Sequence, residues 1–295
     1  MPKTALVLSG GGAKGAFQFA AEKYAREVKG YKWDLIAGVS VGALNGVMLA
    51  MQKYARLEEI WKNISNGQVY TGKMNFWAIV KLLFGSDSVY GNKPLKELID
   101  REVDLSLIKT DLRIGAVSLW TGEYKLFTPK DPVFGPKLAE IVLASTAMPI
   151  IWEPLALTDK YREMVDGGLR NISPLGDVLD AQPDLVVVIN CNPSIPSVQE
   201  RPFKNILEIG KRSLEVALNE IFVTDIREFL RVNKNVQEAA AHNCVLHNEQ
   251  GKPFKYYEYK IIQPEVALGD TLDFSRESIQ RSMDAGWAAA EKVLG

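Results

Sequence analysis

The sequence contains few of the residues on which metal, redox and imidazole chemistry depends. Its 295 residues include only two histidines, His242 and His247, and two cysteines, Cys191 and Cys244. The cysteines are too far apart in sequence to form a CxxC motif, so we expect neither a redox pair nor a zinc site from them. This cysteine usage favours a reduced, intracellular protein.

An excess of charge of one sign and long apolar runs are also missing. Lys and Arg total 35 against 36 Asp and Glu, which gives a formal net charge of −1 with no block of like charge. A nucleic-acid partner is therefore not expected. No apolar run has the length of a membrane span. The opening MPKTALVLSGGG is a poor signal peptide, because its short apolar stretch runs straight into glycines. Together these absences predict a cytoplasmic protein.

The composition that remains is that of a globular α/β protein. Hydrophobic residues make up 47% of the chain, enough for a substantial buried core. Apolar runs at 5–8 and 33–39 predict buried strands, and helical periodicity follows each of them at 14–28 and 41–54. This strand–helix–strand–helix opening predicts right-handed crossovers and a parallel sheet.

The later elements extend the same pattern. Further strands are predicted at 112–119, 123–127, 163–165, 185–190 and 256–262, and further helices at 203–241 and 276–294. The strand at 185–190 is apolar throughout, which is typical of a central strand covered on both faces. We find no repeat and no linker. We therefore predict one domain over 1–295 with a three-layer α/β/α fold and a mostly parallel sheet. Its motif-bearing core covers 4–190, and helices, a late strand and a closing helix occupy 200–295.

One segment, GKMNFWAIVKLLFG at residues 72–85, differs from its surroundings. It is rich in aromatic residues and leucine and carries only two charges, Lys73 and Lys81. It can be a core helix. It can also be a lid over a site for apolar substrates. A third alternative is a helix that contacts a membrane surface near such a site, as in a peripheral membrane protein.

The glycines after the first strand fit two kinds of site. Gly10, Gly12 and Gly15 match the G-x-G-x-x-G pattern between a strand and a helix. A dinucleotide site also needs an acidic residue at the end of the second strand, whereas Asp34 stands at its start. Lys14 is followed by glycine, which excludes a Walker loop. Such a loop gathers backbone N–H groups at a helix start, where they can bind a phosphate or the oxyanion of ester cleavage.

The stretch Gly38-Val39-Ser40-Val41-Gly42 has the pattern of a nucleophile elbow. In such an elbow the serine occupies a strained turn between a strand and a helix, and glycines two residues away on either side avoid clashes. The helix that follows directs its N-terminus at the serine and favours a developing negative charge. A simple Gly-Ser-Gly turn without chemical role gives the same pattern.

Two kinds of proton acceptor can serve this serine. A Ser-His-Asp triad would have to use His242 or His247, and the order along the chain permits it. No strand end brings either histidine to the carboxyl edge of the predicted sheet, however. Asp166 follows a short strand and precedes Gly167 and Gly168. A carboxylate at that place can reach the serine directly and act as the general base.

Several stretches, in this order along the chain, resemble motifs of the patatin-like phospholipase family. They are Ser9-Gly10-Gly11-Gly12-Ala13-Lys14-Gly15, then Gly38-Val39-Ser40-Val41-Gly42, then Asp166-Gly167-Gly168. Ala144-Ser145-Thr146-Ala147-Met148-Pro149 is similar to the Ala-Ser-x-Ala-x-Pro segment that precedes the aspartate in the family. The resemblance covers residues 4–190.

The resemblance implies a serine lipid acyl hydrolase of the phospholipase A, lysophospholipase or carboxylesterase type. Ser40 would be the nucleophile and Asp166 the general base. The remaining motif residues would form the oxyanion loop (Gly10, Gly11, Gly12), continue it (Ala13, Lys14, Gly15) and support the backbone turns (Gly38, Gly42, Gly167, Gly168). Lys14 would orient that loop or an anionic head group. The chemistry requires no metal and no cofactor. An acyltransferase, a non-catalytic lipid-binding relative and a dinucleotide-binding enzyme remain the alternatives.

Overall fold

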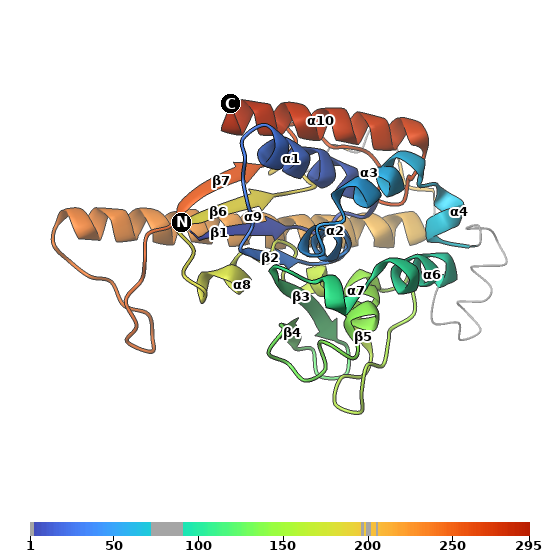
Figure 1. The fold of residues 1–295 in the computed structure, drawn as a ribbon, viewed down its shortest axis with the longest axis horizontal. Helices are drawn as coiled ribbons and strands as arrows, with labels where there is room; N and C mark the ends of the chain where they lie inside the picture. The colour runs from blue at the N-terminus through green and yellow to red at the C-terminus, as the bar shows by residue number, and fades with distance from the viewer. Residues whose placement is uncertain (1–2, 72–90, 196–197, 199–201, 205) are drawn as a thin grey trace.

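A central β-sheet forms the middle layer of the molecule, and its strands lie side by side (Figure 1). The computed structural model describes residues 3–71, 91–195, 198, 202–204 and 206–295. The parallel strands are β1 (Thr4–Leu8), β2 (Leu35–Gly38), β3 (Asp111–Ser118), β6 (Leu185–Ile189) and β7 (Glu258–Ile262). The order β4-β3-β2-β1-β6-β7 places β2 and β6 on opposite sides of β1. The chain therefore changes direction at β1, and ligands of open α/β sheets bind at the carboxyl ends of strands at such a switch point.

Two short strands, β4 (Tyr124–Phe127) and β5 (Met164–Asp166), pair antiparallel with β3. The strands β2 and β5 share one side of β3. Gly38 at the end of β2 lies opposite Ile114, and Asp166 in β5 lies opposite Ala116, two residues further along β3. Thus β3 holds the end of β2 and the end of β5 next to each other.

Helices cover both faces of the sheet. One face carries α1 (Gly15–Glu27), α2 (Val41–Ala50), α3 (Tyr54–Asn63), α4 (Asn66–Val69), α6 (Lys93–Glu102), α7 (Leu138–Thr146) and α10 (Arg276–Leu294). The opposite face carries α8 (Gly176–Leu179) and α9 (Ile206–Ala241). Short 3-10 turns follow β1 at Gly12–Lys14, α6 at Leu105–Leu107, and β5 at Gly167–Leu169. The predicted three-layer α/β/α architecture with a mostly parallel sheet is confirmed.

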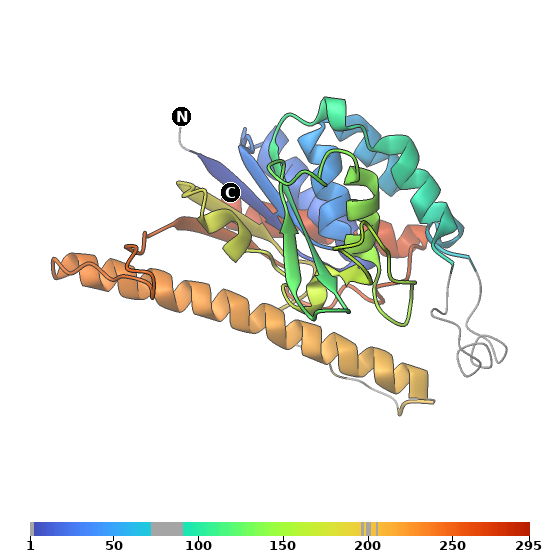
Figure 2. The ribbon, with the colours of Figure 1, turned by 90° about the horizontal axis from the view of Figure 1, so that it is seen from below.

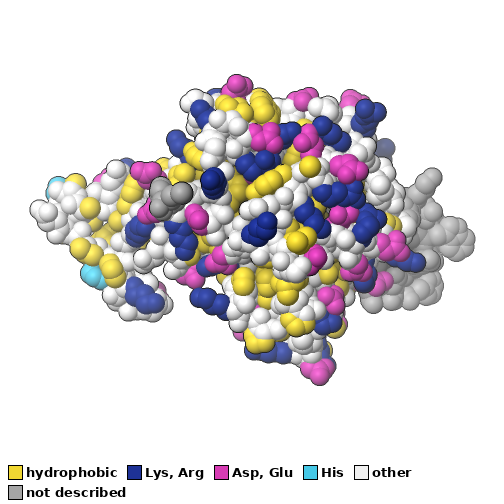
Figure 3. Space-filling model, in the orientation of Figure 1, with side chains coloured by type: hydrophobic (Ala, Val, Ile, Leu, Met, Phe, Trp, Pro, Cys, Tyr) yellow, Lys and Arg dark blue, Asp and Glu magenta, His cyan; other side chains and the backbone are white. Residues whose placement is uncertain are grey.

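The long helix α9 crosses the whole molecule under the sheet and projects beyond it at one end (Figure 2). Its 36 residues correspond to about 54 Å at the usual rise of an α-helix. Positive and negative side chains are mixed over the face in Figure 3, as the balanced composition predicts. None of the helices in the described ranges has both the length and the apolar character needed to span a bilayer.

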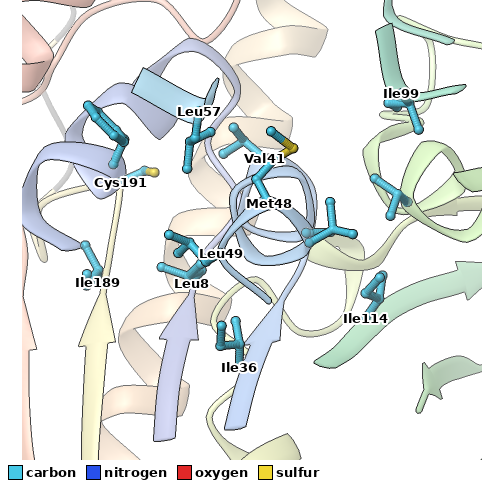
Figure 4. Packing of buried hydrophobic residues seen from close by; sticks show 14 of the residues in the cluster. Leu8, Ile36, Val41, Met48, Leu49, Leu57, Ile99, Ile114, Ile189 and Cys191 are labelled. Atoms are coloured by element: carbon cyan, nitrogen blue, oxygen red, sulfur yellow. The ribbon is translucent and has the colours of Figure 1, made fainter. Parts of the chain in front are cut away.

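The alternation of strand residues produces two apolar cores. Leu6 and Leu8 of β1 pack into the larger core, under α1 and α2, whereas Ala5 and Val7 pack against α9 on the other face. Figure 4 shows Leu49 of α2 beside Leu8. Because both faces of the sheet are covered by helices, its parallel strands read as nearly continuous apolar runs in the sequence.

Most of the predicted elements form with small changes at their ends. The helix predicted at 203–241 begins at Ile206, the strand predicted at 33–39 covers Leu35–Gly38, and the closing helix covers Arg276–Leu294 as predicted. Asp166 is the last residue of β5, whereas the prediction placed it just after the strand. The segment 72–85, predicted as a core helix, a lid or a membrane contact, lies outside the described residues.

Candidate active site

Ser40 stands at the turn between β2 and α2 in a strained backbone conformation. Its φ is 55° and its ψ is −129°, and it is the N-cap of α2. A positive φ is costly for a residue with a side chain and is typical of functional sites. A Cβ on Gly38 would lie 2.3 Å from the carbonyl oxygen of Gly42, and one on Gly42 would lie 2.2 Å from that of Leu8. Both elbow glycines are therefore required for steric reasons.

Asp166 is buried at the end of β5, with 5% of its surface exposed. Its Oδ1 accepts a hydrogen bond from the N–H of Gly168 at 2.8 Å. Burial raises the pKa of Asp166 to about 6, and hydrogen bonding from the Ser40 hydroxyl and the Gly168 N–H opposes that rise. Burial outweighs both donors because the charged form loses its hydration. The pKa of this carboxyl group therefore lies near neutrality.

Ser145 joins the elbow to β3, and the sequence did not identify it as a site residue. Its Oγ accepts a hydrogen bond from the N–H of Ser40 at 3.0 Å and donates one to the carbonyl oxygen of Gly115 at 2.7 Å. The side chain is fully buried. Two residues later, Ala147 accepts a hydrogen bond from the N–H of Asp166 at 3.0 Å. The only signal for this role was the Ala-Ser-x-Ala-x-Pro stretch, which carries no chemical assignment of its own.

The glycine loop after β1 lies beside Ser40. A Cβ on Gly10 would approach the Cβ of Ser40 to 3.2 Å. The N–H of Gly10 donates to the carbonyl oxygen of Ile172 at 2.9 Å, so it is already engaged. Among the described residues, the N–H groups of Gly11 and Gly12 have no hydrogen-bond partner. Two amides of this loop are thus available as donors.

Gly12 shows why the end of the loop has no side chain. Its φ is 56°, and a Cβ there would lie 2.3 Å from the carbonyl oxygen of Thr271. The next residue, Ala13, donates its N–H to the same oxygen at 2.8 Å. The segment that precedes α10 therefore fixes the end of the glycine loop through the carbonyl oxygen of Thr271.

A buried network of hydrogen bonds fixes the start of the glycine loop from the interior of the protein. The side-chain amide of Gln18 donates to the carbonyl oxygens of Ser9 at 2.7 Å and Ile189 at 3.2 Å. Asn45 donates to Gln18 at 3.1 Å and accepts from the indole N–H of Trp61 at 2.9 Å. A fully hydrogen-bonded network of this kind favours a single arrangement of its side chains, because any buried polar group left unpaired would cost free energy. In the sequence, Gln18 and Asn45 are only polar residues within apolar helices, so their role was not predicted.

The predicted residues meet in one cavity of about 390 Å³, which we call the α9 pocket. Ser40, Asp166, Gly11 and Lys14 line it, together with mostly apolar side chains of α9 and of residues 148–151. The Nζ of Lys14 donates to Oδ1 of Asn192, another lining residue, at 2.8 Å. The strained serine, the buried carboxyl group and the glycine loop thus line the same space.

A second, smaller cavity also reaches Ser40. It has a volume of about 80 Å³ and lies among α2, α3 and α6, and we call it the α2–α3–α6 pocket. Gly12 and Ser40 line one part of its wall. Ser40 therefore stands where two cavities meet.

The rival site residues lie elsewhere. His242 and His247 are exposed and line neither pocket that contains Ser40. They lie in the segment that follows α9, at the projecting end of the molecule (Figures 1 and 3). Asp34, the acidic residue considered for a dinucleotide site, accepts a hydrogen bond from the N–H of Thr4 at 2.8 Å. It therefore lies at the amino ends of β1 and β2, away from the glycine loop.

Comparisons with known proteins identify the family of the chain. The model of the Patatin-like phospholipase family matches residues 6–179. A comparison with curated proteins returned no match. Among solved structures, the chain is similar to VipD from Legionella pneumophila, with 15% sequence identity and a TM-score of 0.48. That alignment covers 99% of this chain and 66% of the VipD chain, so this chain spans about two thirds of that length.

Proposed function

The chain belongs to the patatin-like phospholipase family, and on this premise we propose that it hydrolyses lipid acyl esters with a Ser40–Asp166 dyad. One observation supports this proposal most strongly. A serine in a strained elbow and a buried aspartate with a pKa near 6 line the same largely apolar pocket. An apolar cavity with few polar groups suits a lipid ester, and the polar groups mark the reacting end.

The first stage transfers the acyl group to the enzyme. The carboxylate of Asp166 takes the proton of the Ser40 hydroxyl as its oxygen attacks the ester carbonyl. The N–H groups of Gly11 and Gly12 stabilise the oxyanion of the tetrahedral intermediate. When the intermediate collapses, Asp166 returns the proton to the leaving alkoxide. The products of this stage are a free alcohol and an acyl ester on Ser40.

The second stage uses the same groups with water. Asp166, again ionised, takes a proton from a water molecule that attacks the acyl ester. The proton then passes to the oxygen of Ser40, the fatty acid leaves, and the enzyme is restored. Lys14, held by Asn192 at the edge of the same pocket, supplies a positive charge for an anionic head group.

Acyl transfer is the neighbouring activity, because an alcohol in the place of water would yield a new ester with the same residues. A lipid-binding relative without turnover would show neither reaction. Cytoplasmic location and contact with a membrane surface stay predictions from the sequence.

Hydrolysis of p-nitrophenyl esters tests the proposal. We expect Ser40→Ala and Asp166→Asn each to lower kcat by at least about 10³-fold, since members of a catalytic unit fail together. The double variant His242→Ala/His247→Ala is the matched control and should keep wild-type activity. Loss of activity in that control, with the fold intact, would contradict the dyad and restore a triad. Formation of a new ester with added alcohols would identify an acyltransferase.

A further inference from the structure

Two cavities meet at Ser40, and their linings differ in chemistry. We propose that the α2–α3–α6 pocket binds the fatty acyl chain of the substrate, while the α9 pocket receives the alcohol half. This inference rests on the proposed function and goes beyond it by assigning each half of the ester to a place. It also makes the residues of the smaller pocket the determinants of acyl-chain length.

The position of the acid–base group decides which half goes where. Asp166 lines the α9 pocket and is not part of the wall of the α2–α3–α6 pocket. In the proposed mechanism Asp166 protonates the leaving alkoxide and later activates water. Both the alcohol and the water must therefore approach from the α9 pocket. With the alcohol on that side of Ser40, the acyl chain extends to the other side.

The wall of the α2–α3–α6 pocket is suited to hydrocarbon. Three helices each contribute one face at helical spacing: Val41, Leu44 and Met48 from α2, Leu57, Ile60 and Trp61 from α3 with Ile64 directly after it, and Leu95, Leu98 and Ile99 from α6. Such spacing places the side chains on one face of each helix. Val41, Met48, Leu57 and Ile99 are drawn in Figure 4. Each methylene buried here should raise kcat/KM about fourfold.

The polar atoms of this wall bond to other parts of the protein. Trp61 donates its indole N–H to Asn45 at 2.9 Å, and Thr146 donates its hydroxyl to the carbonyl oxygen of Leu143 at 2.7 Å. Glu102 is ion-paired with Arg56 at 2.6 Å. Trp152 is different, because its buried indole N–H has no partner within the described residues.

The α9 pocket is larger and more varied. Beside its apolar residues it presents polar and charged ones, namely Lys14, Asn192, Arg212, Glu215 and Asn219. A glycerol unit or a head group finds several polar side chains there, whereas the smaller pocket offers the unpaired indole N–H of Trp152 in a mostly apolar wall. The difference in lining thus points to the same assignment as the position of Asp166.

Two variants of Ile99 test the assignment directly. Ile99 is 3% exposed and lines only the smaller of the two pockets at Ser40. We expect Ile99→Trp to lower kcat/KM at least tenfold on the longest p-nitrophenyl esters of an acetyl-to-palmitoyl series, with little change for acetyl. Ile99→Ala should shift the optimum toward longer chains. Leu44→Trp, on the half-buried side of α2, should repeat the effect of Ile99→Trp if that variant fails to fold.

The controls separate this proposal from the proposed function. Ile141→Ala removes an equally buried isoleucine of α7 that lines neither pocket, and it should leave the chain-length profile unchanged. Leu218→Trp fills the α9 pocket and should lower rates with bulky alcohols while keeping the acyl optimum. An unchanged profile in folded Ile99 and Leu44 variants, or an acyl shift in Leu218→Trp, would overturn the assignment.

Binding provides a readout that does not need turnover. Fatty acids of increasing length should raise the Tm of the Ser40→Ala protein, and Ile99→Trp in the same background should abolish the gain for the longest ones. If the proposed function is wrong, ester hydrolysis will persist in Ser40→Ala or be absent from the wild type, whatever the binding shows. If only the assignment is wrong, hydrolysis will depend on Ser40 while binding ignores Ile99.

Discussion

Asp166 combines two properties that normally oppose each other, burial and charge. Its pKa of about 6 means that the ionised form is held in the fold at a cost, because little water reaches it and few donors replace that water. A general base needs such a pKa, since a carboxyl group of ordinary pKa binds a proton too weakly near neutrality. The cost to stability and the gain in basicity therefore have the same origin.

Stability should reveal this cost through its dependence on pH. The folded pKa of Asp166, about 6, exceeds the ordinary value of 3.8, so the stabilisation from its proton is complete below pH 3.8 and is lost as pH rises through 6. We expect Asp166→Asn to raise the free energy of unfolding at pH 8 by up to about 3 kcal/mol. Most of this gain should vanish at pH 4.5. Chemical denaturation at both pH values measures it, and an equal gain at both would contradict the assignment.

The same pKa should govern catalysis in the wild type. In the proposed mechanism Asp166 must be ionised to accept the serine proton, so kcat/KM should fall as pH drops below about 6. A plateau that extends down to pH 4 would show that another group serves as the base.

At the scale of elements, the site depends on how three chain segments meet at β3. The elbow follows β2, Asp166 ends β5, and both strands pair with the same side of β3. Ser145 at the end of α7 fastens this meeting point, since it bonds both to Ser40 and to Gly115 of β3. It touches the backbone rather than the reacting atoms, so its role is positioning.

Removing the Ser145 hydroxyl should therefore misplace Ser40, the proposed nucleophile. We expect Ser145→Ala to lower kcat by about 10- to 100-fold with little change in KM, because small displacements of reacting groups are costly. The acid limb of the pH profile should stay near 6, as Asp166 is unchanged. Ser282→Ala, which removes an equally buried serine from α10, is the control and should leave kcat intact. A similar loss in both variants would mean a general loss of stability.

Two helical glycines should respond in opposite directions to the same substitution. A Cβ on Gly286 of α10 would lie 2.2 Å from the carbonyl oxygen of Phe17 in α1, whereas a Cβ on Gly210 of α9 would meet nothing within 4 Å. We expect Gly286→Ala to destabilise the protein by about 1–3 kcal/mol through overpacking. Gly210→Ala should stabilise it by roughly 0.5–1 kcal/mol, since alanine favours the helix. Thermal unfolding of both variants measures the two changes in stability. Changes of the same sign would contradict the close contact between α10 and α1.

At the scale of the whole molecule, the C-terminal region completes the structure that carries the site. The family match ends at residue 179. Beyond it, β6 pairs with the full length of β1, α10 packs on α1, and α9 supplies much of the wall of the α9 pocket. These contacts support the proposal that 1–295 is one domain.

Truncation tests that proposal. A fragment of residues 1–192 lacks β7, α9 and α10, which exposes apolar surface on both faces of the sheet. We expect it to show no cooperative thermal unfolding by circular dichroism. The full chain should unfold in a single transition with matching calorimetric and van't Hoff enthalpies. A fragment that melts cooperatively would instead indicate a separate C-terminal unit.

Local chemistry in the sequence indicated the strands, the helices α1, α2, α9 and α10, the glycine loop, the elbow at Ser40 and the candidate base Asp166, whereas α3, α4, α6, α7 and α8 were not predicted. Apolar periodicity and glycine placement depend on near neighbours, so they can be read along the chain. Only the tertiary structure decided what depends on contacts between distant segments. The hydrogen bond between Gly10 and Ile172 and the position of Ser145 between Ser40 and Gly115 are of this kind. So are the location of both histidines outside the two pockets and the presence of two cavities at Ser40. Such contacts join residues from 30 to more than a hundred positions apart, and no local pattern records which of them will meet.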